Sequence, residues 1–224
     1  MLIEFVLYNT AAEVDGQDHL QQTQKAHEAV IASQEGFHSR AMGIPSGEAA
    51  AGWADLVIWE SPKHVHAAME TIGRAPEAQP WTAQMVQDGM VMRTADVLYR
   101  LNRNFSGVSD EADGAWLIVT WKALADIDFD KHVAGSKAVH KAVLQNLPGY
   151  RGGLLGYDAK REEFVEVLAW DNLEAAQASY SAAMASSAPI FAEHMAECDE
   201  ESVTVTFVTP ALRFTASSVR ASVG

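Results

Sequence analysis

Residues 19–37 of the chain read HLQQTQKAHEAVIASQEGF, and residues 132–150, at an offset of 113, read HVAGSKAVHKAVLQNLPGY. Five of the aligned pairs are identical: His19 with His132, His27 with His140, Ala29 with Ala142, Val30 with Val143, and Gly36 with Gly149. Most of the other pairs keep size or polarity, as Thr23 and Ser136 do. An internal repeat of this kind indicates that the chain is a tandem duplication.

Both copies of the segment have the apolar spacing of an amphipathic helix. His27 and His140 fall on the apolar stripe, so both are predicted to face the core. His19 and His132 lie eight residues earlier, roughly 12 Å back along the helix axis. The two histidines of one helix therefore cannot share a metal ion.

Length and composition favour an ordinary globular protein built from two similar halves. The chain has 224 residues, of which 48% are hydrophobic and 21% charged, and its 113-residue period predicts halves of roughly 100 residues. No apolar run approaches the ~20 residues that span a bilayer. The opening MLIEFVLYNTAAEVD lacks the basic region of a signal peptide, so we expect a cytoplasmic protein.

The net charge is 16 − 30 = −14, with acidic residues in both halves. This argues against nucleic acid or an anionic membrane as partner, because both bind basic surfaces. A small-molecule ligand is therefore the expected partner. Cys198 is the only cysteine, which excludes an internal disulfide and a cysteine-based metal cluster. We interpret it as a small buried residue of an acidic helix rather than a nucleophile, and no metal site is predicted.

Each half is predicted to contain strand, helix, strand, strand, helix and strand, the ferredoxin-like βαββαβ order. The predicted strands are residues 2–8, 37–44, 52–60 and 96–102 in the first half and 115–121, 150–157, 163–171 and 202–208 in the second. After the repeated helix come helices at 62–73 and 77–88, and at 173–186 and 188–200.

The predicted boundaries are 1–105 for the first repeat, 106–114 for a linker, 115–211 for the second repeat and 212–224 for a flexible tail. A four-stranded sheet with helices on one face leaves its other face bare, and the second copy is the nearest cover. The expected fold is therefore α+β, a pseudo-twofold barrel of two facing sheets. Further pairing of this pseudo-dimer into a homodimer stays open.

One sequence pattern resembles a known family. Gly36-Phe37 and Gly149-Tyr150 end the repeated helix, and later strands end in Trp59-Glu60-Ser61 and Trp170-Asp171-Asn172. This pattern resembles the antibiotic-biosynthesis-monooxygenase-like family of dimeric α+β barrels, here in one chain, over residues 1–102 and 115–208. The resemblance implies a superfamily of cofactor-independent monooxygenases acting on aromatic polyketides, haem-degrading enzymes and small proteins of unknown role.

His27, His140, Asp55 and Glu166 are the candidate catalytic residues. The histidines could be core residues bonded to neighbouring groups, or bases that titrate near neutral pH. Asp55 and Glu166 share strand faces with tryptophans, which is unusual for a core. If those faces look toward the repeated helices, His27–Asp55 and His140–Glu166 become two equivalent pairs in which a carboxylate orients an imidazole. The alternative is an idle, solvated carboxylate at a sheet edge.

The candidate substrate-binding residues are Tyr8, Asn9, His38, Trp53, Trp59 and Trp170. Four of them belong to the first half alone, where the second half has Trp121, Lys122, Arg151 and Phe164. We therefore expect unequal pockets, with the first half as the working site. Lys122 and Arg151 are expected to bring positive charge toward the second pocket.

Haem is the alternative cofactor. In the haem-degrading members that the resemblance implies, an asparagine, a tryptophan and a histidine act together. The first half offers Asn9 and Trp59, but its last helix carries Trp81 and no histidine, and the second half offers Trp170 and His194 without the asparagine. Neither half holds the full set, although His194 alone could be an axial ligand.

The leading hypothesis is a cofactor-independent monooxygenase that binds a small aromatic or polyketide-like molecule between sheet and helices. Such chemistry requires a base and a dry apolar pocket in which the substrate carbanion meets oxygen. The rival hypotheses are a non-catalytic, small-molecule-binding or stress-related barrel, and a haem-binding or haem-degrading protein.

Overall fold

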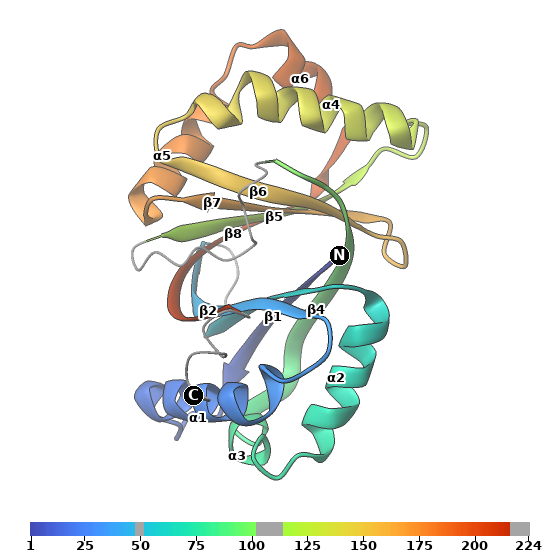
Figure 1. The fold of residues 1–224 in the computed structure, drawn as a ribbon. Helices are drawn as coiled ribbons and strands as arrows, with labels where there is room; N and C mark the ends of the chain where they lie inside the picture. Colours follow the sequence, from blue (N-terminus) through green and yellow to red (C-terminus); the bar gives the residue numbers. More distant parts are fainter. Residues whose placement is uncertain (48–51, 102–113, 216–224) are drawn as a thin grey trace.

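The computed structural model describes residues 1–47, 52–101 and 114–215. Two antiparallel four-stranded sheets face each other in the middle of the molecule, and helices cover their outer faces (Figure 1). Helices α1, α2 and α3 lie outside one sheet, and α4, α5 and α6 lie outside the other. The predicted α+β fold is confirmed.

The first half supplies one sheet in the order β4-β1-β3-β2. Its strands and helices are β1 (Leu2–Thr10), α1 (Gly16–Ala26), a π-helical turn (His27–Ile31), β2 (Phe37–Gly47), β3 (Trp53–Trp59), α2 (Pro62–Arg74), α3 (Gln79–Thr82) and β4 (Met85–Arg100).

The second half repeats the order as β8-β5-β7-β6. Its elements are β5 (Ala115–Ala123), α4 (Phe129–Ala142), a short 3-10 turn (Leu144–Asn146), β6 (Tyr150–Asp158), β7 (Glu163–Trp170), α5 (Leu173–Met184), α6 (Pro189–Met195) and β8 (Cys198–Thr215). Each half is thus a ferredoxin-like unit, as the repeat predicts.

The two sheets join along both edges into a closed barrel. β2 pairs with β8, for example Ser39 with Thr215, and β4 pairs with β6, for example Asp96 with Tyr157. Among the described strands, the pseudo-dimer therefore has no free sheet edge.

Alternation along each strand separates two kinds of core. In β3, Ala54, Leu56 and Ile58 face the barrel interior, where they pack with residues of both halves. Val57 and Trp59 point the other way and pack against α1 and α2. This period of two follows from the pleat of a strand, and it places Asp55 on the helix-facing side, as expected.

The repeated helices begin and end where the sequence indicates. Asp15 caps α1 by accepting hydrogen bonds from the backbone N–H groups of Gln17 and Asp18, and Asp128 caps α4 through Lys131 N–H. After the helices, Gly36 and Gly149 adopt φ values of 75° and 78°. Only glycine enters this left-handed region at low cost, so these two residues let the chain turn into β2 and β6.

The last strand of each half is longer than predicted. β4 begins at Met85 and β8 at Cys198, so the predicted helices 77–88 and 188–200 are too long at their C-terminal ends. Residues 85–95 are held as a strand by pairing with β1, in which Met85 faces Thr10 and Ala95 faces Ile3. Cys198 accordingly starts a strand and does not lie in a helix.

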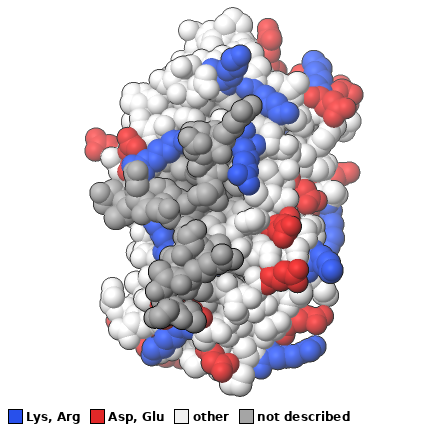
Figure 2. Space-filling model, in the orientation of Figure 1, with Lys and Arg blue, Asp and Glu red and all other residues white. Residues whose placement is uncertain are grey.

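β8 also extends to Thr215, into the predicted tail, because its end pairs with β2. Most of the predicted linker 106–114 and the tail from residue 216 lie outside the described residues. No helix among the described residues is long and apolar enough to cross a bilayer. Acidic and basic side chains are intermixed over the face drawn in Figure 2, with uncharged areas between them.

Candidate functional site

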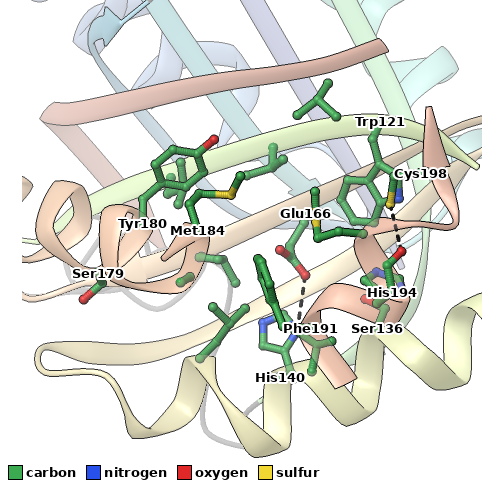
Figure 3. A pocket seen from close by; sticks show the side chains of 18 of the residues that line it. Trp121, Ser136, His140, Glu166, Ser179, Tyr180, Met184, Phe191, His194 and Cys198 are labelled. Carbon is green, nitrogen blue, oxygen red and sulfur yellow. Dashed lines mark hydrogen bonds and ion pairs between the residues drawn. The ribbon is translucent and has the colours of Figure 1, made fainter. Parts of the chain in front are cut away.

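Each half holds a cavity between its sheet and its helices. The second-half cavity lies between β5, β7 and β8 on one side and α4, α5 and α6 on the other, and apolar side chains form most of its wall (Figure 3). Its volume is ≈ 100 Å³, well above the minimum of about 10–15 Å³ that a single water needs, so a small organic molecule is a possible occupant.

His140 and Glu166 form the polar centre of this cavity. Nδ1 of His140, in the last turn of α4, lies 3.2 Å from Oε1 of Glu166 on β7. Both residues are buried, and neither ring nitrogen of His140 makes a hydrogen bond with a described residue, so the approach of Nδ1 to Glu166 is a close contact. The predicted pairing of His140 with Glu166 is therefore confirmed as a contact, whereas its catalytic role stays a prediction.

Burial keeps this pair uncharged near neutral pH. Removal from water raises the pKa of Glu166 to about 8. Burial first, and the neighbouring His194 second, lower the pKa of His140 to about 3. A carboxylic acid that is still protonated at pH 7 can donate its O–H, and Nδ1 of the neutral imidazole lies 3.2 Å from Oε1 of Glu166.

The first half does not repeat this arrangement, and the predicted His27–Asp55 pair is wrong. Asp55 accepts hydrogen bonds from the Arg40 guanidinium, with Nη2 2.6 Å from Oδ2 and Nε 3.0 Å from Oδ1. Arg40 is 1% exposed and Asp55 5%. A buried guanidinium needs a carboxylate more than an imidazole does, which explains the choice of partner.

His27 lies instead among aromatic rings. Its ring stacks on Phe214 with 3.7 Å between centroids and meets the edge region of Phe37 at 5.3 Å. Neither ring nitrogen has a hydrogen-bond partner among the described residues. Burial, with Arg40 second, lowers its pKa to about 3. His27 also opens a π-helical turn, whereas His140 belongs to a regular α-helix, so the backbone at the two positions differs.

The paired tryptophans line the two cavities, as expected, but their indoles are engaged differently. Nε1 of Trp59 donates to Oε2 of Glu4 at 2.7 Å. Leu117 occupies the position of Glu4 in the second half, and Nε1 of Trp170 has no acceptor among the described residues. The second cavity therefore contains a buried N–H group in its wall whose hydrogen bond is unused.

The other predicted binding residues do not line either of these cavities. The Tyr8 hydroxyl is buried against Nε2 of His19 at 3.0 Å, and Trp53 packs on the same ring. Asn9 is exposed and accepts the backbone N–H of Gly52 at 2.7 Å. His38 is exposed because the register of β2 and β3 shifts between Phe37 and Ser39, leaving His38 as the extra, unpaired residue.

The positive charge expected at the second cavity is absent from it. Lys122 is exposed, and Arg151 lies 2.6 Å from Asp171 outside the cavity. Of the described residues, no Lys or Arg lines the second cavity, whereas Arg40 lines the first. The expectation that the pockets differ is confirmed, but the charge lies in the opposite half from the one predicted.

A groove leads from the surface to His140. Its wall includes Tyr99, Lys137, Lys141 and Tyr150, and His140 belongs to both the groove and the second cavity. Nζ of Lys137 sits over the Tyr99 ring, 4.7 Å from its centroid. His140 therefore borders both the groove and the second cavity.

Sequence reasoning missed a side-chain cluster at one end of the second cavity. Nitrogen atoms of His132 and His194 and the sulfur of Cys198 all lie within 4.8 Å of one another, and all three residues are buried. Figure 3 shows His194 and Cys198 beside Trp121 at this end. Aligning residues 81–85 with 194–198 at the same offset of 113 would have drawn attention to it.

The second cavity does not suit haem. A tetrapyrrole is far larger than the space described, and no Lys or Arg among the described residues lines the cavity itself to pair with its propionates. His194 also lies against the His132 ring, with 4.5 Å between centroids. The axial-ligand interpretation of His194 is not supported by this packing.

Comparison with solved structures shows the dimeric α+β barrel fold. A provisionally assigned monooxygenase of Lactobacillus acidophilus NCFM matches with a TM-score of 0.62 and 13% identity, over 96% of both chains. An anthrone oxidase-like protein matches with 0.64 and 13%, over 96% of this chain and 93% of its own.

A point mutant of the chlorite dismutase from Candidatus Nitrospira defluvii matches with 0.58 and 8%, over 99% of this chain and 94% of its own. Identities this low establish the fold and leave the activity open. No protein-family model matches the sequence, and neither does any curated protein.

Proposed function

We propose that the chain is a cofactor-independent monooxygenase with a small hydroxylated aromatic ketone such as an anthrone as substrate class. The proposed working site is the second-half cavity, in place of the first-half pocket that the sequence favoured. The observation that carries the proposal is the buried His140–Glu166 pair at the wall of an apolar cavity. The matches to a monooxygenase and to an anthrone oxidase-like protein support the class of reaction.

The residues have separate roles in this proposal. When Glu166 is ionised, its carboxylate accepts the Nδ1–H of His140 and leaves the Nε2 lone pair free to take a proton from substrate carbon. The unused N–H of Trp170 donates to the substrate carbonyl oxygen, which gains negative charge as the enolate forms. Exclusion of water by the apolar wall protects the carbanion.

The reaction balances without a cofactor. The carbanion transfers an electron to O₂ and recombines with it, which forms a carbon–oxygen bond and a peroxide. Protonation of the peroxide and loss of water turn the original CH₂ into C=O. One O₂ is consumed, the substrate carbon is oxidised, and one oxygen atom leaves as water.

Oxygen uptake with anthrone tests the proposal. His140→Gln is expected to lower the rate by about 10²–10⁴-fold, the usual contribution of a general base. His27→Gln is the matched control, because His27 is the repeat-related histidine and has no carboxylate partner. We expect its rate to equal that of the unmodified protein.

Two results would contradict the proposal. Uptake that survives in His140→Gln, or that is lost equally in His27→Gln, removes His140 as the base. Tight binding of anthrone without oxygen uptake would favour the alternative of a non-catalytic binding protein.

A further inference from the structure

We propose that His132, His194 and Cys198 form a binding site for a divalent transition-metal ion of the zinc class, at the end of the second cavity. The three side chains come from α4, α6 and the first residue of β8. Their ligand atoms lie within 4.8 Å of one another in a buried cluster. Imidazole nitrogen and thiolate sulfur are the ligands that Zn²⁺ prefers.

The internal repeat shows what is special about the second half. At the offset of 113, His132 corresponds to His19, whose ring makes the same two kinds of contact. Nδ1 of His19 lies 2.8 Å from Oε1 of Gln84, and Nε2 lies 3.0 Å from the Tyr8 hydroxyl. A buried histidine at this place is therefore common to both halves and needs no metal.

The residues around that histidine differ between the halves, and the second half has the groups that are better suited to a metal site. Trp81, Gln84 and Met85 of the first half correspond to His194, Glu197 and Cys198 of the second. The second half thus has an imidazole, a carboxylate and a thiol where the first has an indole, an amide and a thioether. All three replacements supply groups that bind a metal or orient its ligands.

Glu197 holds His132 in the tautomer that a metal requires. The Trp121 indole can only donate, and its Nε1 lies 3.0 Å from Nε2 of His132, so that nitrogen carries a lone pair. Nδ1–H then donates to Oε2 of Glu197 at 3.1 Å. Carboxylate–histidine–metal arrangements of this kind orient the imidazole and raise its basicity.

His194 supplies the second observation that points to a ligand. Its Nδ1 is buried and has no hydrogen-bond partner among the described residues. A buried, unpaired nitrogen beside a second imidazole is costly unless something binds there.

Closure on an ion requires small movements. Bonds of about 2.0–2.3 Å place tetrahedral ligand atoms roughly 3.3–3.8 Å apart, so the cluster contracts by roughly 1 Å. His132 exchanges the Trp121 hydrogen bond for a coordinate bond, and Cys198 loses its proton to solvent on binding. His194 and Cys198 both line the second cavity, so the fourth position of the ion faces a cavity ligand or water.

Cobalt(II) is the probe for the test, because a thiolate bound to it gives an intense near-ultraviolet charge-transfer band. Cys198 is the only cysteine of the chain, so that band identifies this site. We expect one equivalent of Co²⁺ to produce the band in the chelator-treated full chain, and Zn²⁺ to displace it. A band that never forms, or that needs several equivalents, overturns the proposal.

Single substitutions test whether the Co²⁺ band arises from the proposed ligands or from other histidines. Cys198→Ser is expected to abolish the band, and His194→Gln to weaken Co²⁺ binding at least 10-fold. Glu197→Gln is expected to weaken it by about 10–100-fold through loss of ligand orientation. His19→Gln is the matched control for His132→Gln, since both remove a buried repeat-related histidine, and only the latter is expected to lose the band.

Far-ultraviolet circular dichroism of each variant checks the fold. Retention of the band in folded His194→Gln at unchanged affinity, or its loss in folded His19→Gln, contradicts the assignment. His140→Gln separates this proposal from the oxygenase proposal, because we expect it to keep the Co²⁺ band whether or not oxygen uptake occurs.

Discussion

At the scale of single residues, the two halves differ in the side chain that contacts the buried carboxyl group of the third strand. Asp55 has a guanidinium and Glu166 has an imidazole. A charged pair sealed at 1% and 5% exposure is fixed in place. A carboxylic acid beside an imidazole keeps a proton that can move between them, which is the more useful arrangement for proton transfer.

Removal of Asp55 is expected to destabilise the protein strongly. Asp55→Ala leaves the Arg40 charge buried without its partner, and we expect the free energy of unfolding in urea to fall by about 3–5 kcal/mol. The exposed pair of Arg151 and Asp171 has the same 2.6 Å separation. Asp171→Ala, measured in parallel, should cost no more than about 1 kcal/mol.

The double variant Arg40→Met with Asp55→Leu completes this comparison. It removes both charges and fills the space with apolar groups, so it should recover most of the loss. A double variant as unstable as Asp55→Ala alone would show that the unpaired charge is not the cause.

Oxygen uptake should depend on the ionisation of Glu166. Burial raises its pKa to about 8, and His140 has a free Nε2 lone pair only when Glu166 is a carboxylate. The rate is therefore expected to rise with pH with a midpoint near 8, and Glu166→Gln should be slow and independent of pH in this range. A Glu166→Gln profile that keeps the same midpoint assigns the titration to another group.

At the scale of the elements, two glycines control the exit from the repeated helices. A Cβ at Gly36 would collide with the His64 ring, and one at Gly149 would lie 2.8 Å from Cβ of Ala175. Gly89 has a similar φ of 76° but open space around it. We expect Gly89→Ala to cost about 1–2 kcal/mol for backbone strain alone.

Gly36→Ala and Gly149→Ala should each cost about 1–3 kcal/mol more than this control, because they add overpacking to the same strain. Urea unfolding of the three variants measures the differences. Equal losses at all three positions would show that backbone strain alone sets the cost.

The order of helices and strands could mostly be predicted from the sequence, whereas the contacts of the site could be predicted only in part. The repeat and the period of two along residues 53–59 and 164–170 predicted which residues face the helices. Hairpin register was not predictable, because the bulge at His38 sets which residue of β2 lies opposite β3. That register puts Arg40 opposite Val57, on the face of Asp55, and so decides the partner of Asp55.

The lengths of β4 and β8 could not be predicted from the local sequence pattern either. Residues 85–95 become a strand through pairing with β1, a contact between distant segments. For the same reason Phe214, in the predicted tail, was not recognised as the residue that stacks on His27.

At the scale of the whole molecule, buried titratable groups of opposite kind set the dependence of stability on pH. Burial lowers the pKa of His27 and of His140 to about 3, so both stay neutral when folded and take up protons on unfolding below about 6.5. Their contribution is present above pH 6.5 and is lost as the pH falls.

Glu4 and Glu166 act in the reverse direction. Burial raises the pKa of Glu4 to about 7 and that of Glu166 to about 8, so both stay protonated when folded and release protons on unfolding above about 4.5. Between pH 6.5 and 8 the two carboxyls lower the free energy of unfolding by about 2–3 kcal/mol, and the two histidines offset this by somewhat less than about 1 kcal/mol, so a net fall of about 1–2 kcal/mol is expected. Urea unfolding across pH 5–9 measures this, and Glu166→Gln should remove most of the fall; a flat profile in the unmodified protein would contradict it.

The closed ladder between the halves has a consequence for how the chain emerges from the ribosome. Ser39 of β2 pairs with Thr215 of β8, 176 residues later in the chain. β4 likewise pairs with β6, which is synthesised after it. Until those partners are synthesised, the first half presents two unpaired strand edges, which are templates for association between nascent chains. Contacts this distant in sequence slow folding, so the interval between translation of the two halves is when the protein is most exposed to aggregation and most dependent on chaperones.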